Sequence, residues 1–291
     1  IVRIHNKDKA IAVSVDSSAN YCESHPITGG KQIVCENWRN LISVGAKPIA
    51  ITNCLNFGNP EDEKIMGQFA ECLEGISEAC TFLNYPIVSG NVSFYNGTNK
   101  KNIYPTPVIG GVGLISKLSQ PIGHKFQAEK NNIILVGKTF GHLEQSCFLK
   151  ENYSITEGRP PEINLLNELN NGNSVLSLIE KKLVVSAHDL SNGGLLTALS
   201  EMCMGSEFGV KIPQPKKLRN IFEYFFGEDQ GRYILEINPK NLRKVKEFLE
   251  ESNIYFENIG FTQKNYFEIE DQMKIGINDL YNINNEWYNN Y

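Results

Sequence analysis

The sequence lacks the features that mark several large classes of protein. No apolar run approaches the roughly 18 to 20 residues that a membrane span requires, and no basic and apolar signal segment opens the chain. Lys and Arg number 28 against 33 Asp and Glu, which gives a net charge of −5. This charge argues against a basic surface for nucleic acid or anionic lipid. We therefore expect no nucleic-acid partner and no membrane.

Several catalytic and metal-binding signatures are also missing. The seven cysteines never adopt C-x-x-C spacing, the five histidines form no H-E-x-x-H pair, and no G-x-S-x-G elbow occurs. These absences argue against a zinc site and a serine hydrolase. An odd number of cysteines, mostly in apolar segments, indicates buried free thiols in a reducing compartment. We expect a cytoplasmic location.

The composition that is present fits a globular protein. At 291 residues, with 41% apolar and 21% charged residues, the chain can form two domains or one large α/β domain, and we favour two. Strands and helices alternate in both halves, so we expect an α/β (α+β) fold. The predicted domains cover residues 1–116 and 117–291, and residues 121–132 form a plausible linker.

Hydrophobic periodicity predicts the principal elements. The clearest helix begins near residues 60–62 and carries apolar residues at alternating steps of three and four from Met66 to Leu83. Residues 28–31, Thr-Gly-Gly-Lys, are expected to precede a helix that contains Ile33 to Ile42. Other predicted strands cover residues 10–16, 48–54, 86–88, 108–114, 133–136, 183–186 and 233–237, and other predicted helices cover residues 195–204 and 241–249.

Two polar segments stand where α/β proteins tend to build ligand sites, after predicted strands. In the first, residues 51–60, Asn53 is one of several amide side chains. In the second, residues 88–96, Gly90 permits close backbone approach, and the Asn91 carbonyl and Ser93 hydroxyl can ligate Mg²⁺ or contact phosphate. The alternative interpretation is a pair of polar turns with local Asn hydrogen bonds.

Together these segments resemble phosphoribosylformylglycinamidine synthase, a family in the aminoimidazole ribonucleotide (AIR) synthase superfamily. The resemblance covers nearly the whole chain. The large subunit of that family is a fused pseudo-dimer whose halves each have two domains, and this chain is similar to the second half only. A chain that begins at Ile1 rather than Met fits a cut from a longer polypeptide. The matching motifs are residues 28–31, 38–41, 44–48, 53–60, 89–96, 105–108, 188–195 and 226–232.

The resemblance implies an ATP-dependent ligase of purine biosynthesis. The family converts formylglycinamide ribonucleotide to formylglycinamidine ribonucleotide through an iminophosphate, with ATP and Mg²⁺, and uses an amide nitrogen from glutamine. The implied partners are the missing N-terminal half, a glutaminase subunit and a small accessory subunit. The family's catalytic histidine belongs to the first half, so we assign no catalytic residue and expect the isolated fragment to be inactive. Two alternatives remain open: a non-catalytic half with a structural nucleotide site, and a homodimeric kinase or cyclo-ligase of the superfamily.

The resemblance also implies roles for individual residues. Asn53 and Gly90 fall at ATP-binding positions, Asn91 at a Mg²⁺ position and Ser93 at a substrate position. Four further residues match first-half active-site segments or an auxiliary nucleotide site, namely His188, Asp189, Glu228 and Gln230.

Two of the matched or neighbouring residues have simpler interpretations. Asp189, which lies before a glycine pair, can equally be a helix N-cap, because Asp favours that position. His25 precedes Pro26 and is expected to be a surface histidine before a proline turn. If the chain is one half of a pseudo-dimer, one face should be apolar and exposed, and the fragment can pair with itself as a homodimer.

Overall fold

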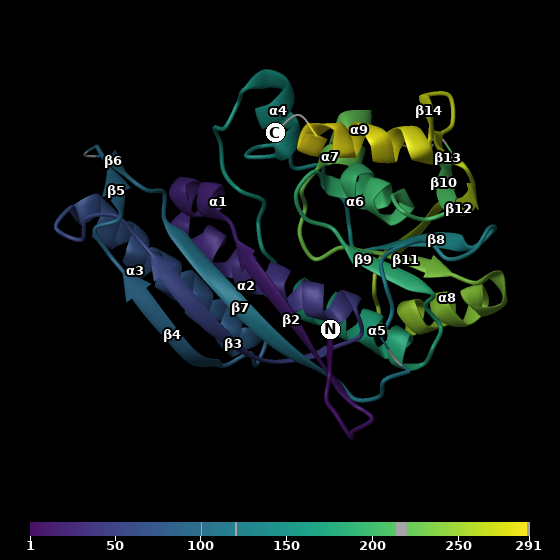
Figure 1. Cartoon of the computed structure of the whole chain (residues 1–291), viewed down its shortest axis with the longest axis horizontal. Coiled ribbons are helices and arrows are strands. Elements are labelled where there is room, and N and C mark those ends of the chain that lie inside the picture. The colour runs from purple at the N-terminus through teal and green to yellow at the C-terminus, as the bar shows by residue number, and fades with distance from the viewer. Residues whose placement is uncertain (100, 120, 214–219, 290–291) are drawn as a thin grey trace.

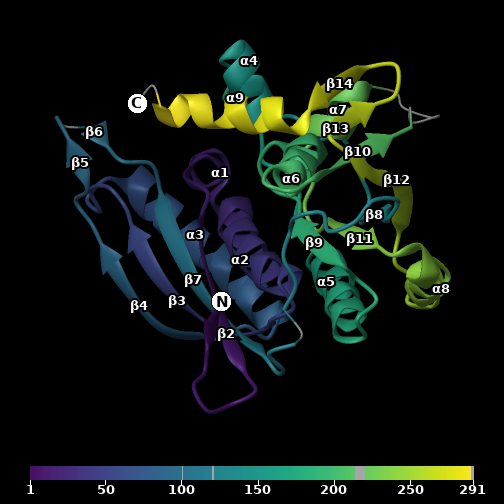
Figure 2. The same cartoon turned by 45° about the vertical axis from the view of Figure 1, so that its right-hand side comes forward.

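The computed structural model describes residues 1–99, 101–119, 121–213 and 220–289. It contains two principal β-sheets, each with helices packed against it (Figures 1 and 2). Residues 2–115 supply the first sheet and residues 132–276 the second, so the expected α/β (α+β) fold is confirmed. The boundary between residues 116 and 117 remains a prediction. Among the described helices, none is long and apolar enough to cross a membrane.

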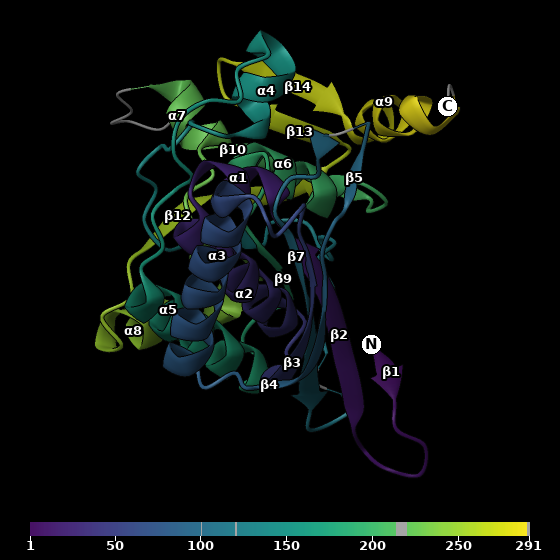
Figure 3. The ribbon, with the colours of Figure 1, turned by 90° about the vertical axis from the view of Figure 1, so that its left-hand side faces the viewer.

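The first sheet has the strand order β1-β2-β7-β3-β4. β3 and β4 are parallel, and the other neighbours are antiparallel. Figure 3 shows α2 and α3 stacked on one side of this sheet, with no described helix on the other. The strands are β1 Val2–Arg3, β2 Ala10–Ser17, β3 Lys47–Asn56, β4 Ile87–Ser93 and β7 Thr106–Ile115; β5 Gly97–Thr98 and β6 Lys101–Asn102 form a separate ribbon.

The helices of the first half are α1 Ala19–Ser24, α2 Pro26–Ser43 and α3 Glu63–Phe82. α2 begins earlier than expected, so the Thr-Gly-Gly-Lys motif lies within the helix and not in a preceding loop. The reason is packing: a Cβ added at Gly30 would collide with the backbone of Cys72 in α3. His25 is half-buried and is the N-cap of α2, where its Nδ1 accepts from the Thr28 N–H at 3.4 Å.

The second sheet has the order β14-β13-β10-β12-β8-β11-β9. Only β10 and β13 pair in parallel. The strands are β8 Asn132–Val136, β9 Ser186–Asp189, β10 Phe208–Ile212, β11 Tyr233–Ile237, β12 Phe256–Lys264, β13 Tyr266–Ile269 and β14 Met273–Gly276. The helices are α4 Cys147–Tyr153, α5 Leu165–Glu180, α6 Gly194–Cys203, α7 Ile221–Phe226, α8 Leu242–Glu251 and α9 Ile277–Asn289, with a 3₁₀ turn at Pro239–Asn241.

The two halves share one hydrophobic core. A single cluster of buried apolar side chains includes Ile51 of the first sheet and Ile134 of the second. At the junction of α2 and α5, the Trp38 ring lies so close to Gly172 that an added Cβ would collide with it. α2 is therefore buried between the first sheet, α3 and α5, and it positions the polar groups described below.

Most predicted elements are confirmed within a few residues, and three regions differ. β3 and β4 continue to Asn56 and Ser93, because each finds backbone hydrogen-bond partners in a neighbouring strand along its full length. The strand predicted at residues 183–186 begins only at Ser186, because the N–H of Leu183 bonds the carbonyl of Leu178 and ends α5.

The prediction for the cysteines is confirmed in its main point. All seven are free thiols. Cys54 and Cys147 are half-buried, and the other five are buried.

Candidate functional site

The residues matched to ATP, Mg²⁺ and substrate positions lie on two neighbouring strands. Asn53 in β3 is opposite Gly90 in β4, and Asn56 is opposite Ser93. Because side chains alternate along a strand, Asn91 and Ser93 lie on the sheet face opposite to Asn53 and Gly90. The structure therefore brings these residues to one edge of the sheet but divides them between its two faces.

Asn53 and Gly90 form a close pair on the helix-covered face. A Cβ added at Gly90 would collide with the side-chain oxygen of Asn53, so the amide of Asn53 lies directly over a bare stretch of β4. The Asn53 side chain is half-buried and makes no hydrogen bond with the described part of the chain. Its amide is therefore free to contact a ligand that approaches this backbone.

Asn91 and Ser93 differ in how much of their hydrogen-bonding capacity is already used. The exposed Asn91 side chain has no hydrogen-bond partner within the described ranges. The Ser93 hydroxyl lies 3.3 Å from the Asn96 side-chain oxygen, and Asn96 donates to the backbone carbonyls of Ser93 and Phe57 at 2.9 and 3.0 Å. The polar turn with local Asn hydrogen bonds is therefore present at Ser93 and Asn96. It does not use the side chain of Asn91.

The face that carries Asn91 and Ser93 also carries exposed apolar side chains. Val13 in β2 pairs with Val112 in β7, and their side chains are 59% and 37% exposed; Val15 is 67% exposed. The registers of β7, β3 and β4 place Asn91 on the same side as these valines. The structure thus has the exposed apolar face that the family resemblance leads us to expect.

A buried charged cluster joins the two halves; the sequence motifs indicated Asp189 and Gln230, but not the burial of Arg39 and Glu168. Arg39 in α2 is 0% exposed, and its Nη1 lies 2.7 Å from Oε1 of Glu168 in α5. Its Nη2 donates to Oε1 of Gln230 at 2.6 Å, and its Nε lies 3.9 Å from Oδ2 of Asp189. The signal in the sequence was a charged residue inside the buried run from Ile33 to Leu41.

Two further carboxyl groups lie beside this cluster. Asp16 at the end of β2 accepts from the side-chain amides of Asn37 and Asn40, each at 2.7 Å. Burial raises its pKa, and burial also raises the pKa of Glu36 to about 7. Within the described ranges no group of three or more His, Cys, Asp or Glu is arranged to hold a metal ion.

His188 and Asp189 line a cavity of about 530 Å³ together with Asp16, Asn40 and His124. His188 Nε2 lies 3.0 Å from Oε2 of Glu201, and its Nδ1 lies 3.4 Å from Oδ1 of Asp189. Burial alone would lower the pKa of His188, but its contacts with these carboxylates raise it to about 10. His188 is therefore an imidazolium cation at neutral pH.

The other matched residues of the second half serve different purposes. Glu228 does not line the His188 cavity, and its carboxylate accepts from the Tyr21 hydroxyl and from the N–H groups of Cys147 and Gly193 at 2.7 to 2.8 Å. The N-cap interpretation of Asp189 is wrong: the N-cap of α6 is Gly193, whose φ of 76° suits glycine, whereas Asp189 ends β9.

Comparison with known proteins identifies the family to which the chain belongs. The family model "AIR synthase related protein, N-terminal domain" matches residues 1–115, and the corresponding C-terminal domain matches residues 129–269. Phosphoribosylformylglycinamidine synthase subunit PurL of Pelagibacter ubique is 52% identical over all 291 residues, and PurL of Rhodopseudomonas palustris strain BisB5 is 41% identical. The chain spans 40% of the length of each of these curated relatives.

Solved structures share the fold at low sequence identity. "T. maritima PurL complexed with FGAR" matches with a TM-score of 0.77 and 17% identity over 94% of this chain and 46% of that one. Thiamine-monophosphate kinase from Stenotrophomonas maltophilia matches with a TM-score of 0.65 and 13% identity over 91% of this chain and 86% of that one. With both domain models matched in order along the sequence, the chain belongs to the AIR synthase related family.

Proposed function

We propose that this chain is part of a phosphoribosylformylglycinamidine synthase. The reaction is the ATP-dependent amidation of formylglycinamide ribonucleotide in purine biosynthesis: ATP phosphorylates the amide oxygen, and ammonia then displaces phosphate. The observation that carries this proposal is 52% identity to PurL of Pelagibacter ubique over every one of the 291 residues. Because the chain spans 40% of that relative, the activity depends on a further segment.

The edge formed by β3 and β4 supplies the ligand contacts in this proposal. The bare backbone at Gly90 and the unpartnered amide of Asn53 suit close contact with ATP. Asn91 offers one neutral oxygen to Mg²⁺, which commonly completes its coordination with phosphate oxygens and water. Because β4 is the outer strand of its sheet, a triphosphate at this edge can reach an ion held by Asn91 on the other face, where Mg²⁺ would neutralise triphosphate charge. Ser93, on the same face as Asn91, contacts formylglycinamide ribonucleotide.

The exposed valines on this face support a shared active site. Asn91 and Ser93 lie on the face that carries Val13, Val15 and Val112, so a partner that covers the valines also covers these two residues. We propose that a second AIR synthase-like half occupies this face, and that a second copy replaces it when the chain is alone. A glutaminase subunit and a small accessory subunit supply ammonia. The seven free thiols fit a cytoplasmic location.

A chimeric enzyme tests the activity. The matching segment of Pelagibacter ubique PurL is replaced by this chain, and product formation is measured with ATP, Mg²⁺, formylglycinamide ribonucleotide and ammonium chloride. We expect activity, and we expect Asn91→Ala to lower turnover at least tenfold with little change in stability. Asn170→Ala is the matched control, because Asn170 is an exposed residue of α5 that does not line the His188 cavity. A folded but inactive chimera contradicts the proposal.

Calorimetry on the chain alone separates the alternatives. Binding of Mg-ATP that Asn91→Ala abolishes supports a ligase half with a preformed nucleotide site. Binding that Asn91→Ala leaves intact, combined with an active N91A chimera, indicates a structural nucleotide site elsewhere. Product formation by the chain alone as a dimer would support the homodimeric enzyme and contradict the half-enzyme proposal.

A further inference from the structure

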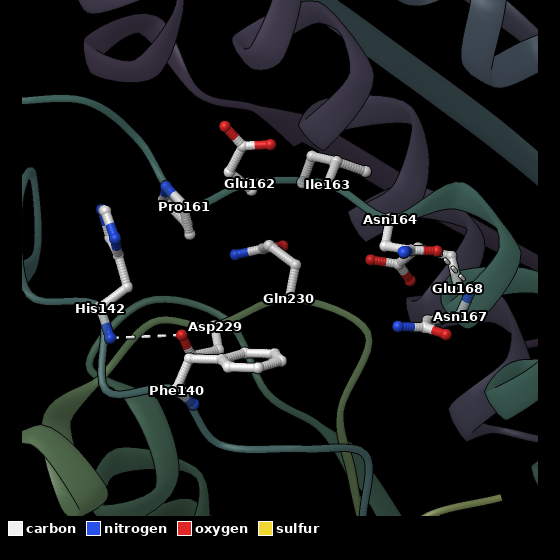
Figure 4. A pocket seen from close by; sticks show the side chains of 10 residues that line it. All are labelled: Phe140, His142, Pro161, Glu162, Ile163, Asn164, Asn167, Glu168, Asp229 and Gln230. Carbon is white, nitrogen blue, oxygen red and sulfur yellow. Dashed lines mark hydrogen bonds between the residues drawn. The ribbon is translucent and has the colours of Figure 1, made fainter.

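A second cavity, of about 450 Å³, lies in the second half of the chain on the other side of Arg39. Figure 4 shows it between the segment that leads into α5 and the loops at residues 140–142 and 229–230. Of the residues matched to the family's sites, only Gln230 lines it. The proposed function does not use this cavity.

The wall of the cavity is partly apolar. Phe140 is 76% exposed, and Pro161 and Ile163 lie across from it in Figure 4. An exposed phenylalanine ring beside a cavity offers both an apolar surface and a negative π face. This side of the cavity suits the aliphatic part of a ligand.

Among the described polar lining residues that are not exposed, most already use their hydrogen-bonding capacity within the protein. The carboxylate of Asp229 accepts from the N–H groups of Phe140, Gly141 and His142 at 2.8 to 3.2 Å. The Gln230 amide accepts from Arg39 and donates to a backbone carbonyl at 2.8 Å. These groups shape the cavity but have little capacity left for a ligand.

Glu168 is the exception. Its side chain is 1% exposed, and burial raises its pKa although Arg39 and the Gly231 N–H favour the carboxylate form. Oε1 pairs with Arg39, whereas Oε2 lacks a well-formed hydrogen bond within the described structure. A buried carboxylate oxygen without a donor is costly, and a donor from a ligand would remove that cost. In Figure 4 the Glu168 carboxyl group projects among the lining residues.

The charge of the lining identifies the kind of donor. Among the described lining residues, three carry carboxylates, namely Glu162, Glu168 and Asp229, and none is Lys or Arg. His142 is the remaining titratable residue among those described in the lining, and its Nε2 lies 2.8 Å from the Arg159 carbonyl. An anionic ligand such as a phosphate would find no cationic side chain among these lining residues, whereas a cation would be attracted to the carboxylates.

We propose that this cavity binds a small organic cation that carries a primary ammonium group. The ammonium donates to Oε2 of Glu168, and the aliphatic chain packs against Phe140, Pro161 and Ile163. An ammonium has three donors and no acceptor, which matches a lining rich in acceptors. Glu168 and Gln230 also hold Arg39, so this ligand would bind directly beside the buried junction of the two halves.

The test uses 1,4-diaminobutane as the probe and 1,4-butanediol as its uncharged analogue, titrated calorimetrically into the full chain. We expect the diamine to bind and the diol not to bind. Asn167→Lys places a competing ammonium at the cavity, because Asn167 lines it, and we expect at least tenfold weaker binding. Asn170→Lys adds the same charge to the same helix outside the cavity and should bind like the wild type.

Each outcome of these titrations either supports or contradicts binding of an organic cation in the cavity. Absence of diamine binding, equal binding of the diol, or equal loss of binding in both lysine variants overturns the proposal, the last because it shows only general attraction to an acidic protein. Phe140→Ala is a second check that does not disturb Arg39. It removes an exposed side chain and should weaken diamine binding severalfold without a change in thermal stability.

Discussion

The guanidinium group of Arg39 lies 2.7 Å from the carboxylate of Glu168, and these side chains are 0% and 1% exposed. Arg39 belongs to α2 of the first half and Glu168 to α5 of the second, so a buried ion pair joins the two halves. The same guanidinium donates to Gln230 and lies near Asp189. One side chain therefore forms hydrogen bonds with two polar groups of the other half and lies within ion-pair distance of a third, and each cavity described above has a wall residue near it.

Replacement of Arg39 should be strongly destabilising. Arg39→Met leaves the Glu168 carboxylate buried without its partner, which costs about 3–5 kcal/mol of unfolding free energy. Urea denaturation measures this loss. The double variant Arg39→Met/Glu168→Leu removes both charges and should lose less than the sum of the single variants. Strictly additive losses would contradict energetic coupling between Arg39 and Glu168. Arg243→Met is the control: Arg243 is 87% exposed in its ion pair with Glu247, and the substitution should cost under about 1 kcal/mol.

The sequence predicted the elements whose signal is local. The helix from Met66 to Leu83 shows its apolar face in the spacing alone, and the strand at residues 233–237 is a short apolar run, so both were predicted correctly. The strands β12, β13 and β14 of the second sheet were not predicted. β13 and β14 are only four residues long, and β12 and β13 both pair with β10, which is far away in sequence and which periodicity does not reveal.

The candidate site was predictable in its parts but not in its arrangement. The motif resemblance identified Asn53, Gly90, Asn91 and Ser93, but their distribution over two faces follows from the strand register, which depends on the neighbouring strands. The Arg39–Glu168 pair joins residues 129 positions apart. A single sequence gives no signal that two charged residues so distant will be buried together.

Glu36 should make the protein less stable as pH rises through the weakly acidic range. Burial raises its pKa from the ordinary 4.5 to about 7 in the folded state, so the native protein binds the proton more tightly than the unfolded chain does. The resulting stabilisation is complete below pH 4.5 and is lost as pH rises to 7. Urea denaturation at pH 5 and pH 8 should show Glu36→Gln gaining stability relative to wild type at the higher pH. A difference between the two proteins that does not change with pH would contradict this assignment.

His188 should produce a similar loss in a separate, higher pH range. Its contacts with Asp189 and Glu201 outweigh burial and raise its pKa from 6.5 to about 10, so its contribution is complete below pH 6.5 and lost as pH rises towards 10. Thermal unfolding of wild type and His188→Gln should differ most at pH 6 and converge near pH 10. In Glu201→Gln, which lacks one partner, convergence should occur at lower pH. Equal curves for wild type and E201Q would show that Glu201 has no part in the effect.

Gly90→Ala should weaken nucleotide binding while the fold is retained. The new methyl group collides with the side-chain oxygen of Asn53 and must push that amide aside. β4 is an exposed edge strand, so the expected loss of stability is under about 1 kcal/mol. Calorimetry with Mg-ATP should show at least tenfold weaker binding. Gly67→Ala, where an added methyl group meets no atom within 4 Å, is the control and should bind normally; wild-type affinity in G90A would remove Asn53 and Gly90 from the nucleotide site.

The exposed valines predict self-association of the isolated chain. Val15 is 67% exposed on the apolar face, which a second copy can cover because a twofold axis lets one patch meet itself. Sedimentation at increasing concentration should show a dimer, and Val15→Asp should shift it to monomer because a carboxylate would be buried at the interface. Leu166→Asp changes a residue that is 55% exposed on α5, away from this face, and should leave the dimer intact. A wild-type chain that stays monomeric at high concentration, or a V15D dimer of unchanged strength, would mean that this face does not support pairing between copies.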